Sequence, residues 1–141
     1  MNRLLTGASV LAVLTAAALW LNPAGAQGEK PPTVKEIMGK LNKGPNSMTP
    51  SLGKDLRENP LDWDHIQKES KAFVTLAAAL QKNRPTKGDA GSWEKFSKTY
   101  TDKVKAFEAA VEKKDQKAAQ AAHARLSDMK DCKACHDAHR P

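Results

Sequence analysis

Residues 63–80 decide the fold, and their sequence is WDHIQKESKAFVTLAAAL. Small or apolar residues recur there every three or four positions: Trp63, Ile66, Ser70, Phe73, Ala77 and Leu80. This spacing places them along one side of an α-helix. The helix is expected to open after Asn59-Pro60 and to end before Arg84-Pro85, because a residue that precedes proline is pushed out of the α region.

A second helix of the same kind follows and is expected to open near Ser92. Its apolar positions are again three or four residues apart: Trp93, Phe96, Tyr100, Val104, Phe107 and Val111. Two long helices with one apolar side each must bury those sides, and they can do so against each other.

Shorter helices are predicted before this pair. Thr33 and Glu36 form a capping box, so a helix of about ten residues should start at Thr33 and end at Gly44-Pro45. Its apolar positions are Val34, Ile37, Met38 and Leu41. Thr49-Pro50 is typical of a helix start and predicts a brief helical turn that carries Leu52 and Leu56.

The last helix is expected to begin around Asp115 and to run without a break through an alanine-rich stretch to the cysteines. No segment alternates with period two for long enough to form a strand. The fold class predicted is therefore all-α, an antiparallel four-helix bundle.

The N-terminus has the pattern of a secretory signal peptide over residues 1–26. A cationic start is followed by an apolar run and by Ala24-Gly25-Ala26, a small-x-small cleavage site. A retained membrane anchor is the alternative, since the apolar run approaches the length that spans a bilayer. After cleavage, residues 27–141 would form one domain without stable membrane insertion.

Composition excludes several classes of protein. The 141 residues include 23 basic and 16 acidic side chains, 40% hydrophobic residues and only two cysteines. Collagen, a multi-pass membrane protein and a disordered polyampholyte do not have this composition. Nucleic-acid binding is not expected, because the positive charge is scattered and the chain carries an export signal.

The motif that carries chemistry is Cys132-Lys133-Ala134-Cys135-His136, the C-x-x-C-H pattern of covalent c-type haem attachment. Two thiols three residues apart can bond the two vinyl groups of one macrocycle, and the adjacent imidazole is then carried under the iron. Cys132 and Cys135 are therefore the expected attachment points for one haem c, and His136 is the expected proximal iron ligand. The export signal agrees, because haem c is attached outside the bacterial cytoplasm.

Three other uses of these residues have less support from the sequence. A dithiol redox centre would be expected at a helix start in a βαβ setting, which this chain lacks. Zinc could take Cys132 and Cys135 with His136 or His139, but a closed structural site needs a fourth ligand. A structural disulfide across so small a loop would remove little entropy from the unfolded chain.

A four-helix bundle with C-x-x-C-H on its last helix resembles the class II cytochromes c, which include cytochrome c′ and low-spin proteins similar to cytochrome c-556. In that family an aromatic residue and an arginine commonly follow the motif, and here His139 and Arg140 stand at those positions. The resemblance implies that Arg140 lies near the proximal imidazole and that the distal haem face is covered by the first helix. The role of His139 is left open.

Met38 is the expected distal ligand, since it lies on the apolar side of the first helix next to Gly39. Its thioether opposite a histidine would raise the reduction potential. Core packing is the alternative for Met38, and Met48 is a second candidate ligand. Met129, one turn before Cys132, is expected to share the core face with Leu126 and to pack beside the haem. His65 and His123 are expected at the surface.

These inferences predict a periplasmic one-electron carrier with His/Met-ligated haem and no enzymatic turnover. The alternative is a five-coordinate haem protein that binds nitric oxide or carbon monoxide as a scavenger or sensor. Partners are expected to be redox proteins with acidic surfaces, met by lysines whose attraction should weaken as salt rises. Those lysines are Lys35, Lys40, Lys43, Lys130 and Lys133. A monomer and a homodimer both remain open.

Overall fold

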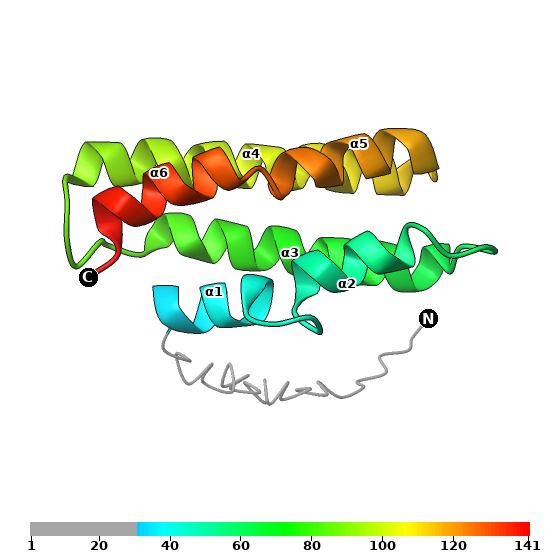
Figure 1. The fold of residues 1–141 in the computed structure, drawn as a ribbon, viewed down its shortest axis with the longest axis horizontal. Coiled ribbons are helices and arrows are strands. Elements are labelled where there is room, and N and C mark those ends of the chain that lie inside the picture. The colour runs from blue at the N-terminus through cyan, green and yellow to red at the C-terminus, as the bar shows by residue number, and fades with distance from the viewer. Residues whose placement is uncertain (1–30) are drawn as a thin grey trace, which may run out of the picture. The chain divides into compact units, whose positions relative to one another are not determined.

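The computed structural model describes residues 31–141, which contain six α-helices and no strand (Figure 1). The helices are α1 (Val34–Asn42), α2 (Met48–Asp55), α3 (Trp63–Lys82), α4 (Ala90–Glu112), α5 (Gln116–Leu126) and α6 (Met129–His139). The all-α fold class is thereby confirmed for this part of the chain. None of these helices is both long and apolar enough to cross a membrane. The signal peptide predicted over residues 1–26 lies outside the described residues.

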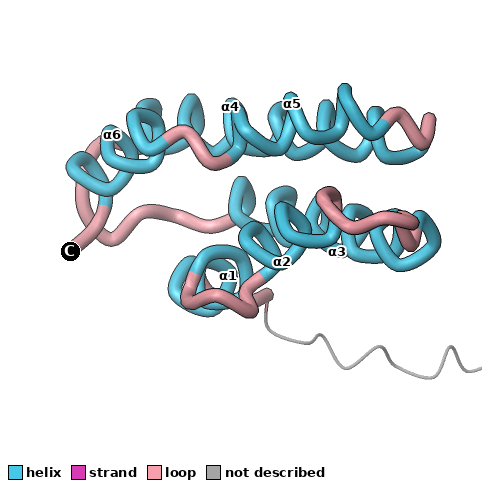
Figure 2. The backbone as a smooth tube through the Cα atoms, turned by 45° about the vertical axis from the view of Figure 1, so that its right-hand side comes forward, coloured by secondary structure: helices cyan, strands magenta, loops and turns pink. Residues whose placement is uncertain are grey.

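The helices lie in two layers, with α1, α2 and α3 in one and α4, α5 and α6 in the other (Figure 2). The loop of residues 83–89 crosses between the layers at one end. In the first layer α1 packs on α2 and α3; in the second, α5 packs along α4 and also contacts α2. Among the described helices, α6 contacts only α4.

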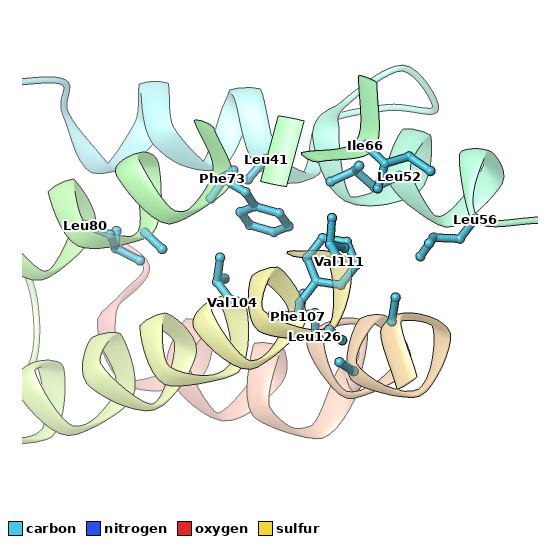
Figure 3. Packing of buried hydrophobic residues seen from close by; sticks show 14 of the residues in the cluster. Leu41, Leu52, Leu56, Ile66, Phe73, Leu80, Val104, Phe107, Val111 and Leu126 are labelled. Carbon is cyan, nitrogen blue, oxygen red and sulfur yellow. The ribbon is translucent and has the colours of Figure 1, made fainter. Parts of the chain in front are cut away.

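The core lies between α3 and α4, where aromatic rings from both helices meet (Figure 3). The Phe73 ring is 6.5 Å from the Phe107 ring at an interplanar angle of 61°, and 6.2 Å from the Tyr100 ring. The buried residues of α3 are Ile66, Ser70, Phe73, Ala77 and Leu80, five of the six predicted from the sequence. The hydroxyl of Thr101 donates to the carbonyl oxygen of Ala77 at 3.1 Å and ties the two helices together.

The capping box at the start of α1 is confirmed, but two other predicted starts are wrong. Ser47 precedes α2 rather than Thr49, and Asp62 caps α3 rather than Asn59. The Asp62 carboxylate accepts a hydrogen bond from the backbone nitrogen of His65 at 3.0 Å. At α3 this side-chain bond to an amide of the first turn fixes the helix start, whereas Ser47 makes no such bond at the start of α2.

The predicted last helix is two helices, so the expectation of one helix from Asp115 to the cysteines is wrong. Asp115 does cap α5, as predicted. However, α5 ends at Leu126, and Asp128 caps a new helix by accepting from the backbone nitrogen of Lys130 at 2.9 Å. Ser and Asp compete with the helical backbone for hydrogen bonds, and this favours a new cap over a continuous helix. With α2 a full helix as well, the described residues hold six helices rather than four.

Candidate functional site

The candidate site is on α6, where Cys132, Cys135 and His136 occupy successive turns. Both thiols are free and only partly exposed. The His136 ring is exposed, and no other residue of the described chain hydrogen-bonds it. Since residues three and four apart share a helix face, α6 presents two thiols and an imidazole without a hydrogen bond within about one turn.

Burial raises the pKa of both thiols. For Cys132 the Asp131 carboxylate adds to that effect, while the Lys103 ammonium, which is paired with Asp131, opposes it. For Cys135 the second cause is the neighbouring Cys132. Reactive dithiols have a lowered thiol pKa, so these two thiols lack the electrostatic activation of a dithiol redox centre.

The two residues after the motif differ in their surroundings. Arg140 is exposed just beyond α6, and its carbonyl oxygen accepts a hydrogen bond from Lys87 Nζ at 3.2 Å. His139 is buried, with 5% of its surface exposed, and its ring meets those of Trp93 and Phe96 edge to face. His139 thus occupies an aromatic environment, and it is a packing residue that the motif alone did not identify.

Met38 lies on α1, partly buried against the hydrophobic core. Its sulfur accepts a hydrogen bond from Asn42 Nδ2 at 3.7 Å. The helices α1 and α6 lie toward the same end of the molecule (Figure 1) but do not contact each other. The structure therefore leaves the two predicted iron ligands, Met38 and His136, on separate helices without bringing them together.

Met129 does not share the core face with Leu126, so that expectation is wrong. Leu126 is buried as the last residue of α5, whereas Met129 opens α6 and is 75% exposed. The break at residues 127–128 resets the helix rotation, and the spacing of the two residues no longer places them on one face. A place for Met129 beside a haem stays a prediction.

The sequence did not identify a pair of buried hydroxyls near the candidate site. The hydroxyls of Tyr100 and Thr49 are buried and have no hydrogen-bond partner within the described residues. Burial raises the pKa of Tyr100 to about 12, opposed by hydrogen bonding toward the Asn42 and Thr49 side chains and assisted by the charge of Cys132. A tyrosine within an otherwise apolar helix face was the signal available in the sequence.

The two other histidines differ in their exposure. His65 is exposed as predicted, and its Nε2 is 3.6 Å from an Asp55 oxygen. His123 was expected at the surface, but it is half-buried, with Nε2 2.7 Å from the Thr49 carbonyl oxygen. Its ring fits because Gly53 has no side chain: a Cβ there would lie 2.6 Å from His123 Cε1.

The lysines predicted to meet a partner are all exposed: Lys35, Lys40, Lys43, Lys130 and Lys133. Lys133 forms an ion pair with Asp137 one turn later, at 2.5 Å. An exposed pair of this kind contributes little to stability, so these side chains remain available to solvent and partners.

Within residues 31–141 no three side chains of histidine, cysteine, aspartate or glutamate gather in a way that could hold a metal ion. A scan against models of protein families finds no match for this chain, and searches of curated proteins and of solved structures find none either.

Proposed function

We propose that this protein is an exported, periplasmic c-type cytochrome of the class II kind that carries one electron at a time. In this proposal α1, α3, α4 and the α5–α6 pair form an antiparallel four-helix bundle with one haem c on the last helix. The observation that carries the proposal is the C-x-x-C-H motif on α6, with two free, partly exposed thiols next to an unpartnered imidazole.

The residues of α6 fit a covalently attached haem. The Sγ atoms of Cys132 and Cys135 would each form a thioether bond, and His136 would bind the iron. Their position on neighbouring turns supports this assignment, as does the absence of any competing hydrogen bond to the His136 ring from described residues. When bound, the haem supplies an iron that accepts and releases one electron.

The surroundings of α6 also fit a large bound group. Buried hydroxyls without hydrogen bonds are unfavourable, and those of Tyr100 and Thr49 form none of ordinary geometry, although Tyr100 lies near Asn42 and Thr49. On α1, a Cβ built on Gly39 meets no atom within 4 Å, so the backbone beside Met38 has open space. Both features leave room for a group beside α1, and α1 and α6 do not contact each other.

Met38 would supply the distal thioether of a low-spin carrier. A second candidate function, a five-coordinate haem that binds nitric oxide or carbon monoxide, is favoured by one observation. The Met38 sulfur already accepts a hydrogen bond from Asn42, on a helix separate from α6. Ligation would require Met38 to exchange that bond for the iron, whereas an open site would leave it in place.

The test is the mass and the visible spectrum of the mature protein made in cells that attach haem c. We expect the mass of the chain plus one haem, and loss of that addition when both Cys132 and Cys135 are replaced by serine. A mature protein without added mass would contradict the proposal. The variant His136→Ala should alter the spectrum, while His65→Ala, an exposed histidine on α3, should not.

Carbon monoxide separates the two haem functions. A reduced spectrum that the gas leaves unchanged supports Met38 ligation, and Met38→Ala should then make the protein gas-sensitive. Val34→Ala is the matched control, because Val34 is also on α1 and partly buried against the core. A wild-type protein that binds the gas directly would instead support the open site.

A further inference from the structure

The helix α6 is anchored in an unusual way for a helix of a folded domain. It has 11 residues, and its one buried residue is a histidine, His139. None of its residues belongs to the hydrophobic core cluster or packs against it as a partly buried hydrophobic. Helices normally dock through an apolar face, so the docking of α6 must have another basis.

Both nitrogens of the His139 ring are hydrogen-bonded to groups outside α6. Nδ1 lies 3.0 Å from the carbonyl oxygen of Lys87, and Nε2 lies 2.9 Å from Ser92 Oγ. The ring meets Trp93 edge to face at 5.4 Å and Phe96 at 6.0 Å. One side chain thus joins the end of α6 to the loop before α4 and to the first turns of α4.

The hydrogen bonds of His139 can be satisfied whether the ring is neutral or charged. A carbonyl oxygen only accepts, so Nδ1 carries a hydrogen and donates to Lys87. In the neutral ring Nε2 accepts from the Ser92 hydroxyl. In the protonated ring Nε2 donates to Ser92 Oγ, and the Ser92 hydroxyl then donates to the Asp89 carbonyl oxygen, 3.0 Å away. Neither state leaves a buried nitrogen without a partner.

The loop of residues 83–89 approaches the His139 ring closely at Gly88. Gly88 has a φ of +87°, a left-handed conformation that glycine adopts without strain. A Cβ there would lie 2.4 Å from the Ala138 carbonyl oxygen and 2.6 Å from His139 Nδ1. The loop backbone therefore touches the end of α6 only because residue 88 has no side chain, and the neighbouring Lys87 reaches the Arg140 carbonyl as well.

We propose that His139 is the positioning residue of α6: by bonding Lys87 and Ser92 from a single ring, it fixes the rotation of α6 about its axis. His136 is one turn earlier on the same helix, so this rotation also sets the direction of the proposed iron ligand. The effect on a haem depends on the proposed function, whereas the anchoring of α6 by His139 does not.

The test uses the full chain as purified and compares backbone hydrogen exchange in residues 129–139 with exchange in residues 63–82. The decisive variant is His139→Phe, because phenylalanine keeps a ring between Trp93 and Phe96 but makes neither hydrogen bond. We expect α6 to exchange about tenfold faster while α3 is unchanged, since two hydrogen bonds at one anchor are lost. His65→Ala, the matched histidine control, should leave both regions unchanged.

Unchanged exchange in α6 of His139→Phe would overturn the proposal and assign the anchoring to ring packing alone. Ser92→Ala provides a milder variant that removes only the Nε2 partner and leaves the Asp89 cap on the Ser92 backbone nitrogen intact. It should give a smaller acceleration confined to α6. If hydrogen exchange in α6 is no faster in either variant, the assignment is contradicted, even if one of the variants folds poorly.

In haem-loaded protein the same two variants should shift the reduction potential, while His65→Ala should not. This readout separates the two proposals. If the mass measurement finds no haem but exchange in α6 rises as expected, the proposed function fails and the anchor stands. If haem is present while exchange and potential both stay unchanged, the anchor fails and the function stands.

Discussion

Different interactions hold the α3–α4 pair and the terminal helix α6 in place. Between α3 and α4 the contacts are apolar, with Phe73, Phe107 and their neighbours fully buried. The contacts of α6 are polar or aromatic: the His139 ring, the ion pair between Lys103 and Asp131, and a hydrogen bond from Lys87. The stability of the fold and the placement of the candidate site thus depend on separate sets of residues.

This difference explains how the C-x-x-C-H motif can lie on a helix that contributes so little to the core. A helix that contributes no apolar residue to the core leaves its own faces uncovered, and Cys132 and Cys135 remain partly accessible as a result. In the proposed function the haem would supply the apolar area that α6 lacks.

The largest expected effect comes from the α3–α4 core. Phe73→Ala removes a fully buried ring that contacts Tyr100 and Phe107, and should cost about 3–5 kcal/mol of unfolding free energy. Denaturant unfolding followed by circular dichroism measures this loss. The exposed Lys68→Ala on the same helix is the control. A loss near zero for Phe73→Ala would mean that the core lies elsewhere.

A smaller effect is expected from Tyr100, which lies where the core approaches α6. Its pKa is raised from 10.0 to about 12 in the folded chain, so the folded state keeps a proton that the unfolded state releases. The stability from this group is therefore complete below pH 10 and is lost as the pH rises toward 12, by on the order of 2 kcal/mol.

The measurement for Tyr100 compares guanidinium unfolding of the wild type and of Tyr100→Phe at about pH 8 and about pH 11. Lysine titration affects both proteins alike, so the difference between them isolates the tyrosine. The wild type should lose more stability than the variant over this interval. Equal losses would show that the phenol is not held in its neutral form by burial.

The smallest expected effect comes from α6 itself. Met129→Gln changes a residue that is 75% exposed, so the free energy of unfolding of haem-free protein should change by no more than about 0.5 kcal/mol. In haem-loaded protein the same change should cost more if Met129 packs beside the haem as predicted. Unfolding curves of both forms decide this, and equal, negligible changes would remove Met129 from the haem environment.

The sequence predicted the α3–α4 core well because that core depends on periodicity. Ile66, Phe73 and Leu80 follow a spacing that only one helix face satisfies, and their burial follows directly. The capping box of Thr33 and Glu36 was equally clear, since both of its hydrogen bonds are local in the chain.

The C-terminal part was harder to predict because local competition and distant contacts decide it. The break before Asp128 depends on a helix cap that competes with a continuous helix of good propensity. The spacing of apolar residues does not reveal whether the capped or the continuous helix is lower in free energy. The burial of His139 depends on Trp93, Ser92 and a glycine loop some fifty residues earlier. The burial of the Tyr100 hydroxyl on α4 and the Thr49 hydroxyl on α2 likewise depends on the packing of helices that are far apart in the sequence.

The cap at Asp128 makes α6 a separate helix instead of a continuation of α5. Since the hydrophobic cluster contains no residue of α6, release of this helix would leave the core intact. An enzyme that modifies the two thiols would need access only to this short segment, and it would not have to act before the chain folds. In the proposed function, attachment of the haem and folding of the domain would then be separable in time, with α6 docking last.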